Sequence, residues 1–161
     1  MEISLEMRVG NKLTQRKLTI ATAESCTGGL ISHRITDVPG SSAYFMGGIV
    51  AYSYEAKAAM LHVTWETLNT KGAVSQETVL EMARGAVQAL GVDIAVSVSG
   101  IAGPGGGTVE KPVGTTWVGL VTPDGEWARH FIWDGDREQN KRYSSDAALD
   151  LVLDYLEGKL K

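Results

Sequence analysis

The feature that most constrains the fold is a continuous apolar run over residues 94–98, with the sequence Ile-Ala-Val-Ser-Val. A run of this kind is typical of a strand that is buried on both faces of a parallel sheet. Two further runs, over residues 18–24 and 47–53, have the apolar or β-branched character of strands. We therefore expect a sheet with several parallel strands at the centre of the molecule.

Helical patterns separate these runs. The clearest helix is expected between Ser75, which resembles an N-cap, and Gly91, which stands where a helix commonly ends. Its apolar residues form one wide face. Other helices are expected over residues 2–15, from Ser25 to before Pro39, over 55–61 and after Arg137, whereas residues 62–74 are expected to form a connecting segment.

The C-terminal half adds a β-hairpin. Two strand-like runs, 115–121 and 126–133, are separated by Thr-Pro-Asp-Gly, which is a strong hairpin signal. Strands that alternate with helices, followed by a hairpin and a closing helix, predict a three-layer α/β/α fold. Its mostly parallel, five-stranded mixed sheet would have one antiparallel member. Residues 1–161 show no repeat and no shift in composition, so we expect a single domain.

Charge and composition exclude several classes of protein. The formal net charge is −4 and the Lys and Arg residues are scattered, so we expect no nucleic-acid partner. No apolar run approaches the ~20 residues needed to cross a bilayer, and the N-terminus lacks the apolar stretch of a signal peptide. We therefore expect a cytoplasmic protein without a membrane partner. The single cysteine and the three histidines form no zinc-like ligand cluster, so no metal is expected.

The most reactive residue types gather where the first strand meets the helix that follows it. Residues 23–29 have the sequence Ala-Glu-Ser-Cys-Thr-Gly-Gly. A side-chain oxygen at this turn would meet the free N–H groups and the positive end of a helix, where a developing oxyanion is stabilised. Ser25 is therefore the first candidate nucleophile. Ser is also a preferred N-cap, so a purely structural role is the alternative.

Two other segments would join this turn at the carboxyl edge of the sheet, where ligands of such sheets gather. One carries Tyr52 and Lys57. A desolvated lysine can be the base for a serine hydroxyl, although a lysine on a short helix is usually a solvated charge. The other is the glycine loop over residues 99–107, which fits neither the dinucleotide fingerprint nor the Walker loop but could hold an anion. A flexible surface loop is the alternative. Counter-charge could come from Lys111, Arg137 or Arg142.

Cys26 competes with Ser25 as the nucleophile. At a helix N-terminus its thiolate would be favoured, which predicts inactivation by iodoacetamide and by Cys26→Ala. A small apolar core residue is the more frequent role of a free cysteine. The histidines offer no better base than Lys57, because His33 and His62 lie within or beside expected helices and His130 lies in the middle of a strand.

These motifs resemble the CinA C-terminal domain family, whose enzymes are nicotinamide mononucleotide deamidases. The resemblance covers roughly residues 5–156. It implies a metal-free and cofactor-free amidohydrolase that converts nicotinamide mononucleotide and water into nicotinate mononucleotide and ammonia in pyridine nucleotide salvage. A homodimer is typical of such proteins. The resemblance is carried by Ala23–Gly29, by Gly40–Phe45 with Gly47-Gly48 and Glu55–Lys57, and by Ser99–Pro104 with Lys111–Thr115.

The resemblance also assigns residues. The family's catalytic serine, tyrosine and lysine fall on Ser25, Tyr52 and Lys57. Our hypothesis for their chemistry is that Lys57 takes the serine proton, Tyr52 relays a proton to ammonia and helix N–H groups hold the oxyanion. Two positions depart from the family, which often has Thr at Ser99 and Asn at Tyr54. A nucleotide-binding or regulatory paralogue without turnover is the alternative function. The resemblance also implies the substrate contacts, which would fall on Ser42, Ser99, Gly100, Ala102 and Arg142. Arg142 and the glycine loop would bind the 5′-phosphate.

Overall fold

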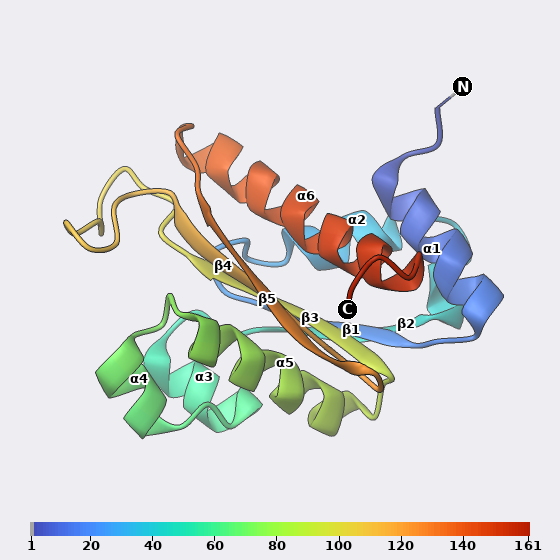
Figure 1. Ribbon diagram of the computed structural model, residues 1–161, viewed down its shortest axis with the longest axis horizontal. Coiled ribbons are helices and arrows are strands. Elements are labelled where there is room, and N and C mark those ends of the chain that lie inside the picture. The colour runs from blue at the N-terminus through green and yellow to red at the C-terminus, as the bar shows by residue number, and fades with distance from the viewer. Residues whose placement is uncertain (1) are drawn as a thin grey trace.

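The computed structural model describes residues 2–161 and has three layers (Figure 1). A five-stranded sheet with the strand order β2-β1-β3-β4-β5 forms the middle layer. β1 pairs in parallel with β2 and β3, whereas β4 is antiparallel to both β3 and β5. The expected mixed sheet with one antiparallel member is therefore confirmed. The strands are β1 (Ile20–Glu24), β2 (Phe45–Val50), β3 (Ile94–Gly100), β4 (Thr115–Thr122) and β5 (Gly125–Ile132).

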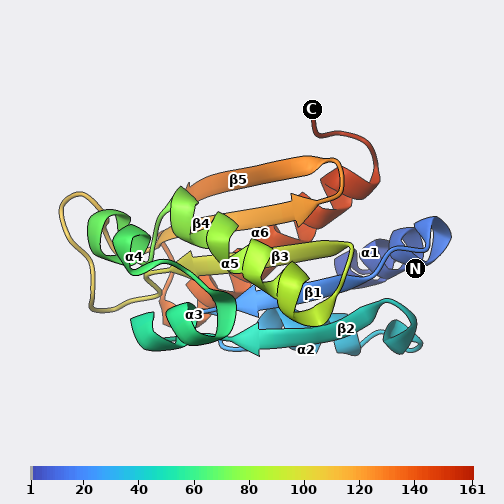
Figure 2. The same cartoon turned by 90° about the horizontal axis from the view of Figure 1, so that it is seen from below.

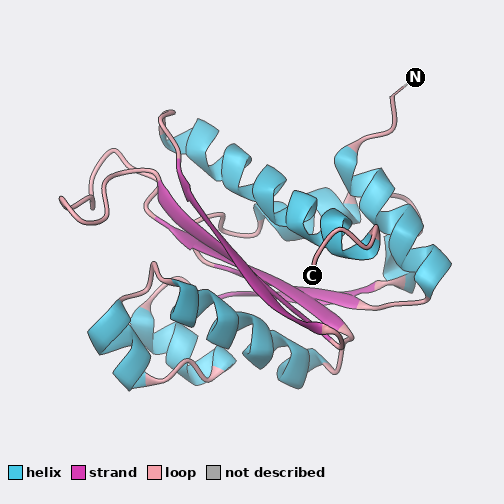
Figure 3. Cartoon of the chain, viewed as in Figure 1, coloured by secondary structure: helices cyan, strands magenta, loops and turns pink. Residues whose placement is uncertain are grey.

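Helices cover both faces of this sheet (Figures 1 and 3). Three of them pack on one face, and the other three lie on the face seen in front of the sheet in Figure 2. A short 3-10 turn, η1 (Ser41–Ala43), leads into β2. The first set is α1 (Leu5–Arg16), α2 (Leu30–Thr36) and α6 (Arg137–Leu156), and the second is α3 (Tyr54–Leu61), α4 (Trp65–Lys71) and α5 (Gln76–Leu90).

The apolar run that predicted the sheet lies in β3 at its centre. Every side chain from Ile94 to Val98 is fully buried. Successive side chains of a strand point to opposite faces, so Val96 packs in the core beneath α6 while Ala95 packs in the core beneath α5. Burial on both faces explains the absence of polar alternation in this run.

The sequence predicted α5 correctly but missed α4, the helix that precedes it. Ser75 Oγ accepts the Thr78 N–H at 3.1 Å, and Gly91 closes α5 with a left-handed φ of 61°. The expected connecting segment is wrong, because α4 occupies seven of its residues. Thr64 Oγ1 caps this helix by accepting the Thr67 N–H at 3.1 Å, and Leu68 anchors it in the core. A helix of two turns is too short to establish an apolar period.

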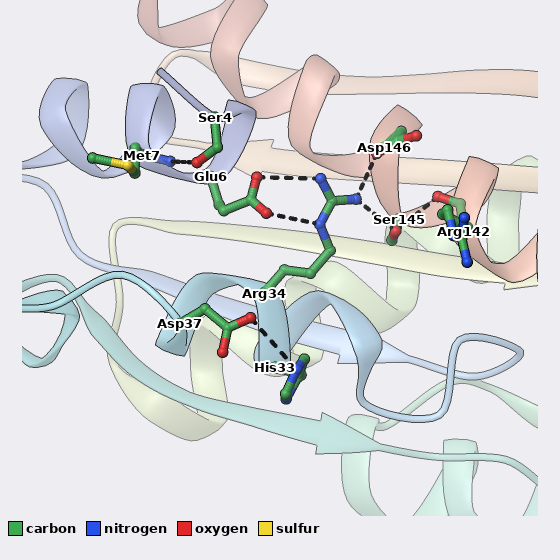
Figure 4. A network of polar contacts seen from close by, with 9 residues as sticks. All are labelled: Ser4, Glu6, Met7, His33, Arg34, Asp37, Arg142, Ser145 and Asp146. Atoms are coloured by element: carbon green, nitrogen blue, oxygen red, sulfur yellow. Dashed lines mark hydrogen bonds and ion pairs between the residues drawn. The ribbon is translucent and has the colours of Figure 1, made fainter. Parts of the chain in front are cut away.

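A three-helix ion network fixes the layer that contains α6 (Figure 4). Arg34 of α2 lies 3.3 Å from the Glu6 carboxylate of α1 and 2.6 Å from the Asp146 carboxylate of α6. Its side chain is only 17% exposed. The network therefore holds three separate helices in register, including the one whose first turn reaches the candidate site. No helix within residues 2–161 is long and apolar enough to cross a membrane.

Candidate active site

Ser25 lies immediately after β1, at the carboxyl edge of the sheet. Its N–H donates to the Val98 carbonyl of β3 at 3.1 Å, which fixes the backbone of the turn. Lys57 of α3 is 1% exposed and places its Nζ 2.9 Å from the Ser25 Oγ. The residues predicted as nucleophile and base therefore lie within hydrogen-bond distance of each other.

The surroundings of Lys57 favour a neutral amine. Its Nζ also donates to the carbonyls of Ala51 at 3.1 Å and Tyr52 at 2.9 Å, and within residues 2–161 it forms no ion pair. Burial lowers the pKa of Lys57 to about 8. A neutral amine has two N–H groups and one lone pair. The two carbonyls can accept both N–H groups, which leaves the lone pair facing the Ser25 hydroxyl.

Glu24, not Ser25, caps the helix after the turn. α2 begins only at Leu30, and the fully buried Glu24 carboxylate lies at its positive end. The expectation that Ser25 caps this helix, and that the helix N–H groups hold an oxyanion, is therefore wrong, because the carboxylate already occupies them. It accepts hydrogen bonds from Thr27 Oγ1 (2.6 Å), Gly29 N (3.2 Å), Ile31 N (2.9 Å), Ser32 N (2.9 Å) and Ser32 Oγ (2.8 Å).

Tyr52 lies at the mouth of the site. Its side chain is largely exposed, and its hydroxyl accepts a hydrogen bond from Arg137 Nη2 at 3.3 Å. The hydrogen bond between Tyr52 and Lys57 is made by the Tyr52 backbone carbonyl. Arg137 also donates from Nη1 to the Gly103 carbonyl at 2.8 Å, so this arginine joins the first turn of α6 to the glycine loop. The sequence had given Arg137 only as one of three possible counter-charges.

The base of the glycine loop reaches the same edge. Ser99 is buried at the end of β3, one residue beyond the carbonyl that accepts the Ser25 N–H. Gly100 ends the strand where any Cβ would overlap the Thr116 side chain. The Ala102 carbonyl accepts a hydrogen bond from Asn140 Nδ2 of α6 at 3.0 Å. No motif pointed to Asn140.

Ser42, a predicted substrate contact, does not lie near Ser25 and Lys57 in this chain. It is exposed on η1, which precedes the amino end of β2. Two residues later, the backbone carbonyl of Tyr44 accepts the N–H of Ile20 at the start of β1. Ser42 therefore lies at the edge of the sheet opposite to Ser25. The other departure from the family, Tyr54, begins α3 and lies 6.4 Å from Trp65, measured between ring centroids.

Of the cations proposed from the sequence as counter-charges, Lys111 lies away from the cleft that Arg137 and Arg142 line. Lys111 turns away from the loop and donates to the Lys71 carbonyl at the end of α4 at 2.7 Å. Arg142 is largely exposed and pairs with Glu138 at 3.7 Å. Sequence reasoning missed Lys141, which lines the same cleft as Arg142. This cleft of about 420 Å³ is lined by Leu30, Arg137, Glu138, Lys141 and Arg142.

Cys26 is buried beside the candidate nucleophile. Burial raises the pKa of its thiol to about 11, so the thiol keeps its proton near neutral pH. The expected thiolate at a helix N-terminus is wrong, because Glu24 occupies that helix end. No group of three or more His, Cys, Asp or Glu side chains within the described residues is placed to hold a metal ion.

The fold and the site together define a class of protein. It is a three-layer α/β protein with a buried serine–lysine pair at the carboxyl edge of its parallel strands. More specifically, the chain belongs to the CinA C-terminal domain family, whose model matches residues 2–156.

Individual relatives agree with this family. A CinA-like protein of Chlorobaculum tepidum is 54% identical over 153 residues, which cover 92% of this chain and 36% of that protein. A CinA-like protein of Chloroherpeton thalassium is 52% identical over 159 residues, which cover 96% of this chain and 38% of that protein. The chain thus spans less than two fifths of the length of these curated relatives.

Solved structures match over nearly the whole chain. A competence-damaged protein (CinA) superfamily protein from Klebsiella pneumoniae has a TM-score of 0.92 and 34% identity, with 96% of each chain covered. The competence/damage inducible protein CihA from Agrobacterium tumefaciens has a TM-score of 0.89 and 39% identity, covering 98% of this chain and 99% of that chain.

Proposed function

We propose that the protein is a nicotinamide mononucleotide amidohydrolase that uses Ser25 as nucleophile and Lys57 as base. The observation that carries this proposal is the 2.9 Å contact between Lys57 Nζ and Ser25 Oγ, made by a buried lysine whose other two contacts are carbonyls. A serine is a weak nucleophile until a neighbouring base removes its proton. The family resemblance supplies the substrate, and the geometry supplies a suitable pair of groups.

The reaction follows from this pair. The Ser25 Oγ forms a bond to the carboxamide carbon while its proton passes to Lys57 Nζ, and the carbonyl electron pair moves onto the oxygen. Collapse of this tetrahedral intermediate breaks the C–N bond, and ammonia leaves with the proton from Lys57. Water then hydrolyses the acyl-enzyme, which releases nicotinate mononucleotide and restores Ser25. Tyr52, at the mouth of the site, remains the candidate relay for the proton of the leaving group.

The cations around the first turn of α6 suit the 5′-phosphate. Arg137, Lys141 and Arg142 line one cleft, and guanidinium groups bind phosphate oxygens in a bidentate manner. Binding energy from a remote phosphate can orient the carboxamide at Ser25. Nicotinamide riboside, which lacks this phosphate, is therefore expected to be a much poorer substrate.

The test is release of ammonia from nicotinamide mononucleotide by the pure protein, followed in a coupled glutamate dehydrogenase assay. Ser25→Ala is expected to lower kcat by at least about a thousandfold. Calorimetry should show that this variant still binds the nucleotide, because the α6 cations are intact. Ser41→Ala, at the opposite edge of the sheet, is the matched control and should keep wild-type kcat.

Two outcomes would contradict the proposal. Full activity in Ser25→Ala would show that another group is the nucleophile. Binding of the nucleotide by the wild-type protein without any release of ammonia would indicate a nucleotide-binding or regulatory protein that does not turn over its ligand.

A further inference from the structure

A second cavity, the β5–α6 groove, lies between the last helix and β5, which is the edge strand of the sheet (Figure 2). Its volume is about 260 Å³, and it shares no lining residue with the cleft at the first turn of α6. Alternate residues of one strand face form one wall, and residues at helical spacing form the other. The first wall includes Arg129, Phe131 and Trp133, and the second includes Tyr143, Asp146 and Asp150.

Three aromatic rings form a continuous surface in this groove. The rings of Phe131 and Trp133 stack with their centroids 4.7 Å apart, and the Tyr143 ring lies 5.5 Å from the Trp133 ring at an angle of 50°. The indole N–H of Trp133 donates to Ser144 Oγ of α6 at 3.1 Å, so this polar atom already has a partner. The rings therefore offer the groove their faces, which carry partial negative charge.

Asp150 is the charged group of the groove that lacks a partner. Within residues 2–161 its carboxylate forms no hydrogen bond and no ion pair, whereas Arg129 lies 2.7 Å from Asp154 and Asp146 lies 2.6 Å from Arg34. Burial raises the pKa of Asp150, and the carboxylates of Asp146 and Asp154 raise it further, against the effect of nearby arginines. A cation in the groove would relieve this repulsion.

We propose that the β5–α6 groove binds a small organic cation, with a quaternary ammonium group against the aromatic rings and Asp150 as its counter-charge. Cations are attracted to the faces of aromatic rings, most strongly to that of tryptophan. A quaternary ammonium has no N–H group, so the ring faces leave none of its atoms without a hydrogen-bond partner. This inference does not depend on the proposed amide hydrolysis, because Ser25 and Lys57 do not line the groove.

Other classes of ligand fit the groove less well. An anion would meet the carboxylates of Asp146 and Asp150, while Arg129 is already paired. A neutral apolar ligand would remove Asp150 from water without giving it a partner. No group of three or more His, Cys, Asp or Glu side chains within residues 2–161 is placed to hold a metal ion. The charge and the rings together therefore select an organic cation.

The probe for this site is choline, and its neutral isostere 3,3-dimethylbutan-1-ol is the control ligand. Each is titrated into the wild-type protein at one ionic strength while the indole N–H resonance of Trp133, identified by its loss in Trp133→Phe, is followed by NMR. Choline should shift this resonance with saturation and a Kd of roughly millimolar. The isostere should bind at least about tenfold more weakly, because it has the same shape without the charge.

Variants separate the two features of the groove. Asp150→Asn keeps the shape of the side chain and should raise the Kd for choline about tenfold. Tyr143→Ala removes one ring from a partly exposed position and should raise it about fivefold. The matched control is Glu66→Gln, which removes one exposed negative charge from α4 on the other face of the sheet and should keep the wild-type Kd.

The outcomes are decisive in both directions. Saturable binding that weakens in both groove variants and not in Glu66→Gln would support the site. Equal affinity for choline and its isostere, a Kd in Asp150→Asn within about twofold of wild type, or no saturation below about 50 mM choline would overturn it. Urea unfolding checks that each variant is folded. Asp150→Asn should also keep wild-type kcat for nicotinamide mononucleotide, so failure of the groove leaves the proposed reaction standing.

Discussion

At the scale of single residues, the site depends on a lysine that is deprived of a counter-ion. Within residues 2–161, Lys57 Nζ forms hydrogen bonds with two carbonyls and one hydroxyl and no ion pair, so no carboxylate there pairs with its protonated form. The resulting fall in its pKa is the property that a general base near neutral pH requires. The cost to stability and the larger fraction of neutral amine near neutral pH therefore have the same origin.

This origin predicts the pH dependence of activity. Neutral Lys57 is the reactive form and its pKa is about 8, so kcat/KM should rise about tenfold per pH unit below pH 8 and level off above it. Initial rates between pH 6 and pH 10 measure this profile. A rate that falls as the pH is raised through 8 would contradict the role of Lys57 as base.

The lowered pKa of Lys57 also predicts how the free energy of unfolding changes with pH. The folded pKa lies below the ordinary value of 10.5, so the unfolded chain binds more protons between about pH 8 and 10.5. The free energy of unfolding should therefore increase with pH across this window, by about 1.4 kcal/mol per pH unit, relative to Lys57→Met. Urea unfolding of both proteins at several pH values gives the difference, which should be constant below pH 8.

At the scale of elements, the base is positioned by helix packing. α3 carries Lys57, and its last residue, Leu61, presents its carbonyl to Gly85 of α5. A Cβ at residue 85 would overlap that carbonyl, so the close approach of the two helices requires glycine there. The placement of the proposed base thus depends on a residue without a side chain in another helix.

Gly85→Ala should consequently affect both stability and activity. We expect the free energy of unfolding to fall by about 3 kcal/mol, because α5 must move away from α3, and kcat to fall with the displacement of Lys57. Gly91→Ala is the control, since residue 91 has a left-handed φ but open space around it. It should cost about 1 kcal/mol and keep kcat. Equal losses in the two variants would rule out the packing explanation.

Elements also show what the sequence could predict. The buried run of β3, the caps of α5 and the hairpin are local patterns, and Ser25 and Lys57 belong to segments that such patterns place at one edge. The capping role of Glu24 was not visible, because three of its five hydrogen-bond donors are backbone N–H groups, up to eight residues away along the chain. The choice between Arg137 and Arg142 depends on the rotation of α6 about its axis, which tertiary packing sets.

At the scale of the whole molecule, Arg34 holds one outer layer together. Its guanidinium joins α1, α2 and α6, and its partner Glu6 is only 18% exposed (Figure 4). Charges that are partly removed from water interact more strongly than those on the surface. The layer therefore depends on one cation more than on any exposed ion pair.

Arg34→Met should lower the free energy of unfolding by about 2 kcal/mol, because it leaves two carboxylates without their cation. The control is Arg84→Met, which breaks a pair whose side chains are 51% and 36% exposed. That variant should lose less than about 1 kcal/mol. Urea unfolding at one ionic strength compares them, and a larger loss in Arg84→Met would refute the argument.

The site draws on all three layers, and this has a consequence for how the chain folds. Ser25 comes from the turn after the central strand β1, Lys57 from a helix on one face and Arg137 from the last helix, on the other face. These residues are far apart along the chain, and contacts of high sequence separation are entropically expensive to close early. An intermediate in which any one of these segments has not yet packed cannot bring the three residues together, so we expect the candidate site to form only after all three have packed.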